Sequence, residues 1–184
     1  MKFTPTTLDG SYLIDLDAKE DERGFFARCF CKNEFYNHGL NAQWVQINNS
    51  LTKGKGTLRG LHFQYPPHAE VKLVRCLTGK IWDVIVDLRL GSNTYGQWFG
   101  AELSGINRTM MYVPKGFAHG FISLEDNSEI LYLVSEFYSP SSEETLIWND
   151  ENVSINWPLQ PLLISSKDSK AKKLQEIDPI TIQE

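Results

Sequence analysis

A histidine, two cations and an amide are gathered within residues 59–72, where together they could bind an anion and move a proton. The segment Arg59-Gly60-Leu61-His62-Phe63-Gln64 is followed shortly by Lys72. Imidazole titrates near neutral pH and can act as a base, while guanidinium and ammonium groups bind anions. Strict strand alternation would place Arg59 and His62 on opposite faces, although a bend in the chain would relax that rule.

A second histidine lies in a motif with a structural meaning. Pro114-Lys115-Gly116-Phe117-Ala118-His119 fits the P-x-G-x-x-H signature of cupin barrels, in which a tight turn leads into a strand that carries the histidine inward. In many cupins this histidine ligates a metal. Here the H-x-H position reads His62-Phe63-Gln64, and the nearby Lys72 would repel a divalent ion. We therefore expect neither a metal nor a cofactor.

The elements that must position these groups are mostly strands. Short apolar runs alternate with turn residues such as Gly79, Gly91 and Gly116, a spacing typical of a sandwich or jelly roll rather than of βαβ units. We predict an all-β cupin jelly-roll barrel with a few short peripheral helices. Strands are expected at residues 11–14, 25–30, 44–48, 58–64, 71–77, 81–88, 98–103, 109–113, 120–124 and 130–137, helices at 33–38 and 167–176, and a loop at 48–56.

Length and composition limit the class of protein. The chain of 184 residues predicts one domain, 1–184, with its core at about 21–168 and a peripheral segment at 169–184. A net charge of −5 and a pI of about 5.4 argue against a nucleic-acid partner, which requires a basic face. No apolar run approaches the roughly 20 residues of a membrane-spanning helix, and the first residues lack the apolar core of a signal peptide. Cys29, Cys31 and Cys76 form no C-x-x-C pair, so we expect reduced thiols and a cytoplasmic protein.

Several stretches, taken together and in order, resemble a single family. They are Asp21-Glu22-Arg23-Gly24-Phe25-Phe26, Arg59-Gly60-Leu61-His62-Phe63-Gln64, Lys72-Leu73-Val74-Arg75, Asp83-Val84-Ile85-Val86-Asp87-Leu88-Arg89, Gly116-Phe117-Ala118-His119-Gly120-Phe121, Tyr132, Tyr138-Ser139-Pro140 and Ile155-Asn156-Trp157-Pro158. From about Asp21 to Asp168 the chain resembles dTDP-4-dehydrorhamnose 3,5-epimerases and their relatives. The resemblance implies an isomerase that binds a nucleotide-diphosphate 4-keto sugar for surface-polysaccharide synthesis. It also implies a homodimer with exchanged N-terminal strands.

The resemblance implies catalytic roles that fit the chemistry of the residues. A 4-keto group acidifies the hydrogens on C3 and C5, so inversion needs a base, a stabiliser of the enolate and an acid on the opposite face. His62 matches the base of the family, and Asp168 matches the carboxylate that orients it. Lys72 matches the cation beside the enolate oxygen, and Tyr132 matches the acid. Because a phenol has a pKa of about 10, we expect nearby cations to make Tyr132 a usable acid.

Further positions match substrate contacts in the family. They are Arg23, Arg59 and His119 for the diphosphate and sugar, Gln46 and Asn48 for the nucleotide, Tyr138 for the base or another part of the substrate, and Glu143 and Lys167 near the substrate. A guanidinium suits a diphosphate better than an ammonium does, because it can donate two parallel hydrogen bonds.

One position departs from the family. Where dTDP-specific members carry a glutamate that contacts thymine, this chain has Arg28. An arginine only donates hydrogen bonds, whereas guanine offers O6 and N7 acceptors and cytosine offers O2 and N3. The departure favours GDP or CDP over dTDP as the nucleotide, unless Arg28 turns away from the site.

Other interpretations stay open at this point. Tyr132 could be a core residue with a buried hydroxyl, and Asp168 could cap a helix. Asp83 and Asp87 are expected to be structural partners of arginines. The nearest alternative function is a single-carbon epimerase, at C3 or C5 alone. A metal-dependent cupin and a non-catalytic sugar-nucleotide binder are the alternatives from other classes.

Overall fold

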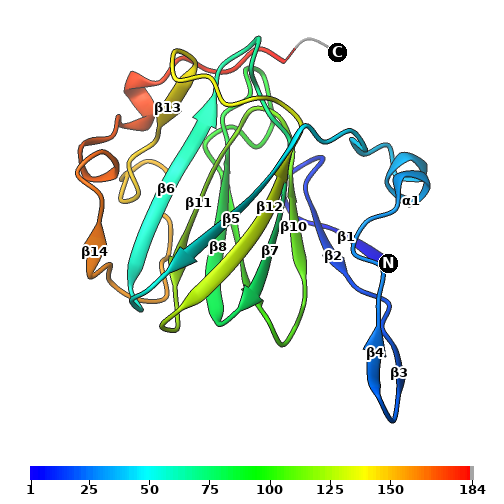
Figure 1. Ribbon diagram of the computed structural model, residues 1–184. Coiled ribbons are helices and arrows are strands. Elements are labelled where there is room, and N and C mark those ends of the chain that lie inside the picture. Colours follow the sequence, from blue (N-terminus) through cyan, green and yellow to red (C-terminus); the bar gives the residue numbers. More distant parts are fainter. Residues whose placement is uncertain (183–184) are drawn as a thin grey trace.

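Almost every element of the chain is a short strand, which confirms the expected all-β jelly roll. The computed structural model describes residues 1–182 (Figure 1). The strands are β1 (Lys2–Pro5), β2 (Tyr12–Asp15), β3 (Lys19–Asp21), β4 (Gly24–Phe26), β5 (Gln46–Thr52), β6 (Thr57–Gln64), β7 (Lys72–Thr78), β8 (Lys80–Asp87), β9 (Trp98–Ser104), β10 (Met110–Val113), β11 (Phe117–Ser123), β12 (Ser128–Val134), β13 (Glu143–Thr145) and β14 (Leu163–Ile164). The helices are α1 (Lys32–Asn37) and the 3-10 helices η1 (Asp168–Lys170) and η2 (Leu174–Glu176). Over the residues described, no helix has the length and apolar character needed to cross a membrane.

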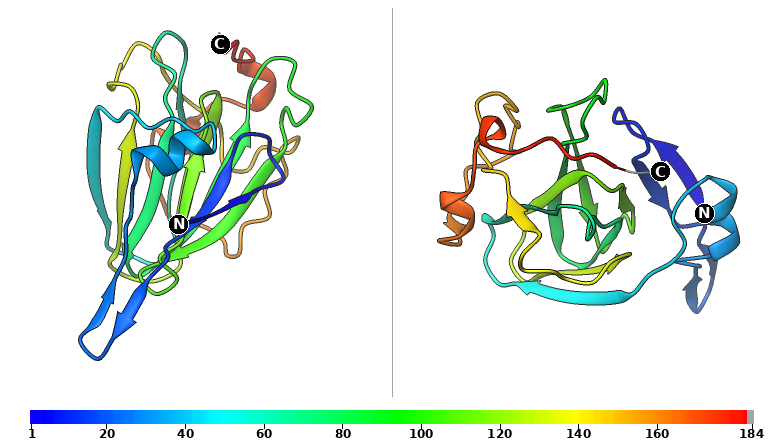
Figure 2. Two further views of the ribbon diagram at one scale, coloured as in Figure 1. Left: turned by 90° about the vertical axis from the view of Figure 1, so that its right-hand side faces the viewer. Right: turned by 90° about the horizontal axis from the view of Figure 1, so that it is seen from above.

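Two sheets face each other and enclose the barrel interior (Figure 2). The first has the strand order β1-β2-β10-β7-β12-β5, and the second has the order β13-β6-β11-β8-β9, with β14 parallel to β6. Between them lies an apolar core that includes Val74, Cys76, Ile85, Met111 and Phe121. Burying such side chains stabilises the fold by roughly 1.5–3 kcal/mol for each large one. The β3–β4 hairpin pairs with neither sheet and extends away from the barrel (Figure 1).

The strand expected at residues 25–30 is wrong beyond Phe26. Strand β4 ends at Phe26, and the chain then passes into helix α1. The aromatic residue that suggested a longer strand, Phe30, packs instead against Phe35 and Trp44 with ring centroids 5.0 and 6.1 Å apart. An aromatic side chain that packs into the core from a loop adds an apolar residue to the sequence, and the run of apolar residues then looks like a longer strand.

The loop expected at residues 48–56 is also wrong in its first half. Strand β5 continues to Thr52 and pairs with β12, so that Asn48 lies opposite Tyr132 and Ser50 opposite Ile130. Small polar residues resemble a loop, yet every second one here faces the barrel interior. Strand β5 is polar because these inward side chains line a polar cavity and not the apolar core.

The segment after Asp168 is less peripheral than expected. Residues 167–176 do not form one helix but contain two 3-10 helices. Leu174, Ile177 and Ile180 are buried in a cluster with Leu61 and Phe63 of β6. This packing holds the C-terminal segment against the second sheet, and the segment begins with Asp168.

Candidate active site

The first sheet directs a row of polar side chains into the barrel. Val134 on β12 lies between Gln46 on β5 and Lys72 on β7, directly opposite each of them. Two residues earlier on β12, Tyr132 lies opposite Asn48 on β5. Residues directly opposite each other in a sheet point to the same face. Since Val134 is buried in the interior, its neighbours Gln46 and Lys72 also point inward.

The second sheet contributes both histidines through a local irregularity. His62 on β6 lies opposite His119 on β11, but between this pair and the Arg59–Phe121 pair the register shifts. At the shift Gly60, with φ +117°, faces Gly120 so closely that a Cβ on Gly60 would come within 2.6 Å of the Gly120 Cα. The bulge lets Arg59 and His62 line the same cavity, although simple alternation would separate them.

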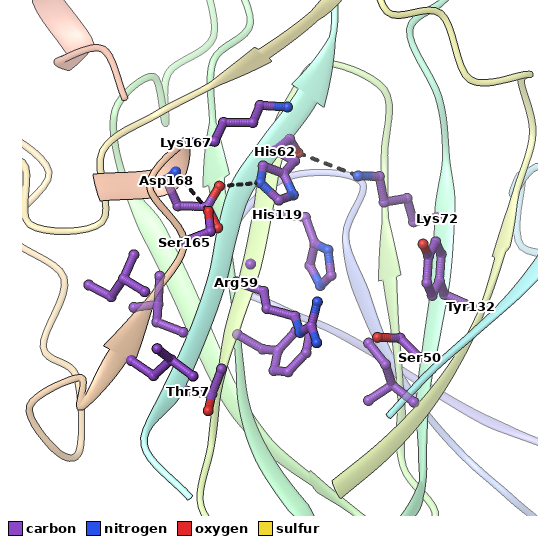
Figure 3. A pocket seen from close by; sticks show the side chains of 16 residues that line it. Ser50, Thr57, Arg59, His62, Lys72, His119, Tyr132, Ser165, Lys167 and Asp168 are labelled. Carbon is purple, nitrogen blue, oxygen red and sulfur yellow. Dashed lines mark hydrogen bonds and ion pairs between the residues drawn. The ribbon is translucent and has the colours of Figure 1, made fainter. Parts of the chain in front are cut away.

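These side chains converge on a cavity of about 500 Å³ (Figure 3). An adjoining cavity of about 410 Å³ shares His62, Lys72 and Tyr132 with it. The first cavity brings together the expected residues Arg59, His62, Lys72, His119, Tyr132, Lys167 and Asp168. The second adds Gln46, Asn48, Tyr138 and Glu143. The structure thus gathers all four residues with expected catalytic roles and most of the expected binding residues.

Asp168 forms a partly buried hydrogen bond with the His62 ring. The His62 Nε2 lies 2.8 Å from Oδ1 of Asp168, and the Gly60 N–H donates to Oδ2 at 3.2 Å. Burial alone would raise the pKa of Asp168. The hydrogen bond and charge of His62, together with the hydrogen bond from the Gly60 N–H, outweigh burial and hold that pKa below its ordinary value. An ionised carboxylate only accepts, so Nε2 carries the hydrogen and Nδ1 keeps a lone pair for a substrate proton. Asp168 does not cap its helix with its side chain, so that alternative is wrong.

Lys72 and Tyr132 lie across the cavity from His62 (Figure 3). The Lys72 Nζ donates to the His62 carbonyl oxygen at 3.4 Å and lies 3.1 Å from Oε1 of Glu70. Burial raises the pKa of Tyr132, the negative charge of Glu70 adds to that rise, and Arg59 opposes it. Nearby cations therefore do not lower the pKa of Tyr132 below its ordinary value, as we had expected them to do. The phenol stays protonated at neutral pH, the state an acid needs at the start of a reaction.

A second histidine–aspartate pair was missed. The His119 Nε2 lies 2.8 Å from Oδ1 of Asp83, which is fully buried, and Oδ2 of Asp83 has no hydrogen-bond partner within residues 1–182. Asp83 is therefore not an arginine partner, whereas Asp87 is, with its Oδ2 2.7 Å from Nη2 of Arg89. The one sequence signal for this pair was a carboxylate inside an otherwise apolar strand.

The remaining residues with expected binding roles also line the two cavities. Glu143 accepts from the Tyr138 hydroxyl at 2.9 Å and from the Lys167 Nζ at 2.5 Å. Burial opposes ionisation of Glu143, but Lys167 and Tyr138 hold its pKa below the usual value. Arg59 donates to the Thr52 hydroxyl at 3.2 Å and forms no ion pair with any carboxylate among the residues described. Its uncompensated charge suits it to bind an anion.

Arg23 and Arg28 lie outside both cavities of this chain. Arg23 belongs to the projecting β3–β4 hairpin, where its side chain is 86% exposed and pairs with Asp21. Arg28 pairs with Glu34 at 3.3 Å. A single chain does not bring either guanidinium to the site.

The donor groups in the barrel do not fit a metal ion. Nε2 of His62 and Nε2 of His119 are each bonded to their own carboxylate, and an ammonium lies beside them. Over the described part of the chain, no group of three or more His, Cys, Asp or Glu side chains could hold a metal.

The cavity of this cupin-type barrel is lined by an imidazole paired with a carboxylate, an ammonium and a phenol, which is a set of groups suited to acid–base chemistry. A family model described as dTDP-4-dehydrorhamnose 3,5-epimerase matches residues 5–176. The dTDP-4-dehydrorhamnose 3,5-epimerase of Methanothermobacter thermautotrophicus is 43% identical over 178 residues, covering 95% of each chain. The dTDP-6-deoxy-D-glucose-3,5-epimerase of Legionella pneumophila, solved with dTDP-4-keto-L-rhamnose, has a TM-score of 0.92 at 39% identity, and the match covers 100% of this chain and 99% of that chain. A 3'-monoepimerase from Streptomyces bikiniensis, solved with dTDP-quinovose, has a TM-score of 0.85 at 30% identity over 93% of this chain and 87% of its own.

The chain belongs to the dTDP-4-dehydrorhamnose 3,5-epimerase family and is an isomerase. The recognition made from sequence motifs is confirmed, and so is the cupin fold.

Proposed function

We propose that the protein inverts C3 and C5 of a nucleotide-diphospho-4-keto-6-deoxy sugar, and that His62, Asp168, Lys72 and Tyr132 carry the reaction. One observation supports this most strongly. The paired histidine stands on the second sheet while the phenol and the ammonium stand on the first, with one cavity between them. A sugar ring in that cavity has a base on one face and an acid on the other.

The steps follow from the chemistry of these groups. Nδ1 of His62 accepts the proton from C3 or C5, and Asp168 stabilises the imidazolium that forms. The electron pair moves onto the keto oxygen, where the Lys72 ammonium stabilises the enolate. Tyr132 then protonates the same carbon from the opposite face, and the configuration inverts.

The cation distribution supports a diphosphate beside the sugar. Lys72, His62, His119 and Lys167 each have a nearby carboxylate, whereas Arg59 has none among the described residues. We propose that Arg59 holds the diphosphate and that His119 contacts the sugar. Gln46, Asn48, Tyr138, Glu143 and Lys167 would contact the nucleotide end.

We also propose that the working form is a homodimer in which the β3–β4 hairpin carries Arg23 to the pocket of the partner. Phe26 of the hairpin is 73% exposed, and Ile47 and Leu51 on the outer face of β5 are 64% and 50% exposed. Such exposed apolar groups are typical of surfaces that bury against another chain. Removing residues 19–26 should reduce diphosphate affinity and dimer formation together, measured by calorimetry and sedimentation. A cytoplasmic location stays a prediction.

For the nucleotide, the relatives are dTDP enzymes by name, which favours dTDP. Arg28 is the observation that favours GDP or CDP instead, because a guanidinium stands where the thymine-binding glutamate of the family is expected. Its pairing with Glu34 shows one way in which it can turn away from a ligand. A competition binding experiment with dTDP, GDP and CDP identifies the nucleotide that the protein prefers. Binding of dTDP at least about tenfold tighter, about 1.4 kcal/mol, removes the GDP or CDP hypothesis.

The decisive experiment is NMR in deuterated water with dTDP-, GDP- and CDP-4-keto-6-deoxy sugars. We expect deuterium at both C3 and C5 of one of them, followed by inversion. Exchange at one carbon alone would establish a single-carbon epimerase, the activity of the Streptomyces bikiniensis relative named above. Tight binding with no exchange would leave only a sugar-nucleotide binder and would refute the proposed reaction.

A further inference from the structure

Glu70 is a carboxylate in the cavity wall that the mechanism above does not use. It lies two residues before Lys72, and its Oε1 is 3.1 Å from the Lys72 Nζ. Both side chains are largely enclosed, at 13% and 10% exposure, and both line the 410 Å³ cavity beside His62 and Tyr132. A carboxylate placed here contacts the ammonium that must stabilise the enolate.

The backbone fixes the position of Glu70. The next residue, Val71, is buried, and its N–H donates to the Ser135 hydroxyl at 2.8 Å while its carbonyl accepts from the Ser135 N–H at 3.0 Å. Ser135 directly follows β12, the strand that carries Tyr132. These bonds hold the backbone next to Glu70 against the end of β12, and Lys72 begins β7 two residues further on.

The ammonium has a reason to need such a partner. A lysine side chain has about 2 kcal/mol of rotamer entropy, so an unattached ammonium samples many positions. Here Nζ contacts Glu70 on one side and the His62 carbonyl oxygen on the other, at 3.1 and 3.4 Å. The His62 carbonyl oxygen accepts one of the three ammonium hydrogens, and the Glu70 carboxylate attracts the charge, so that a hydrogen is left for an oxygen in the cavity. Glu70 also offsets the cost of holding this positive charge away from water.

We propose that Glu70 is a positioning residue, which holds the Lys72 ammonium at the place where the keto oxygen of the substrate becomes an enolate. The inference rests on the proposed function, since it assigns Glu70 a task within the same site. A neighbouring negative charge weakens the field of the ammonium at that oxygen. Fixed placement outweighs this loss, because a displacement of 1 Å in a catalytic site can cost about 10²-fold in rate.

A double-mutant cycle tests the proposal through the first proton exchange, a step that needs His62 and Lys72 and does not need Tyr132. Glu70→Gln should lower the initial rate of deuterium incorporation by about tenfold with little change in KM, because the donor remains but is no longer held. Lys72→Met should lower it by about 10²–10³-fold, as for loss of one oxyanion donor. The double variant with Glu70→Gln and Lys72→Met should exchange at the same rate as Lys72→Met alone, since Glu70 acts through the ammonium.

The controls separate this inference from the proposed function. Glu102→Gln breaks a carboxylate–lysine contact with Lys80, 3.4 Å long and outside both cavities, and should leave the exchange rate unchanged. Glu70→Asp keeps the charge on a shorter side chain, so its exchange rate should lie between that of Glu70→Gln and that of the unaltered protein. Circular dichroism checks that each variant is folded, and Glu70→Asp supplies the test if Glu70→Gln is not.

Three results would overturn the inference. They are an exchange rate in folded Glu70→Gln equal to or above that of the unaltered protein, a loss that multiplies with that of Lys72→Met, or a loss confined to KM. An unaltered protein that exchanges no 4-keto sugar would instead overturn the proposed function. That result is seen before any variant is made.

Discussion

The barrel contains two histidine–aspartate pairs with the same hydrogen-bond length and different surroundings. In each pair Nε2 of the histidine lies 2.8 Å from Oδ1 of the aspartate. The His62 side chain is 35% exposed, however, whereas that of His119 is 10% exposed. The first ring can meet a substrate proton, and the second is largely enclosed by protein.

The two carboxylates differ as well. Asp168 arrives on the 3-10 helix η1 and accepts a second hydrogen bond from the Gly60 N–H. Asp83 lies within strand β8, and its Oδ2 is without a partner among residues 1–182. Asp168 is therefore stabilised as an anion by its own contacts and can balance an imidazolium. We infer that the same hydrogen-bond length serves two tasks: proton transfer at His62, as proposed above, and rigid placement of the ring at His119.

The largest effect should separate the two histidines. His62→Asn should abolish solvent deuterium incorporation at C3 and C5, since loss of a general base costs at least about 10²–10⁴-fold. His119→Asn should keep measurable exchange and mainly raise KM, because we propose that this ring contacts the sugar without taking its proton. NMR exchange rates at several substrate concentrations measure both. Persistent exchange at both carbons in His62→Asn would remove His62 as the base.

The next largest effect should identify the acid. Tyr132→Phe should lower the overall inversion by about 10²-fold while the first proton exchange falls much less, because the phenol acts after enolate formation. The measurement compares deuterium incorporation with the appearance of inverted product. Tyr36→Phe, on the exposed surface of α1, is the matched control and should change neither rate. Equal losses in exchange and inversion would assign Tyr132 to an earlier step.

The two dyads also show how far the sequence alone could reach. Strand spacing and turn residues predicted the jelly roll, because alternation and turn chemistry are local properties. The partners His62 and Asp168 are separated by 106 residues. The spacing of residues along the sequence does not predict a contact over this distance, and the pairing was predicted only from the resemblance to the family. The Asp83–His119 and Glu70–Lys72 contacts were missed, because they depend on registers and side-chain directions that become visible only in the folded barrel.

The positions of Arg23 and Arg28 show a different limit. The motif context predicted substrate contacts, yet in one chain both guanidinium groups lie outside the cavities and pair with Asp21 and Glu34. Sequence resemblance carries over the role of a residue but not the chain that supplies it.

A smaller effect should separate the two aspartates. Asp168→Asn should lower the exchange rate by about 10²-fold or more, because an amide can no longer balance the imidazolium and can select the wrong ring tautomer. Asp83→Asn changes the partner of a ring to which the proposed mechanism assigns no proton transfer, so its exchange rate should fall by less than about tenfold. Exchange rates and melting temperatures of both variants measure the difference. Equal kinetic losses would mean that both dyads take part in proton transfer.

The smallest effect concerns stability in acid. The folded-state pKa of Asp168 is held below its ordinary value of 3.8, so its ionised form stabilises the fold at neutral pH. That contribution is fully present above pH 3.8 and is lost as the pH falls through the folded-state pKa. Asp168→Asn has no such group to protonate. Urea unfolding at pH 6 and pH 3 should therefore show a smaller acid-induced loss in Asp168→Asn than in the unaltered protein. Equal losses would show that the contacts from His62 and Gly60 do not stabilise the carboxylate in solution, and the distinction between the two dyads would then rest on exposure alone.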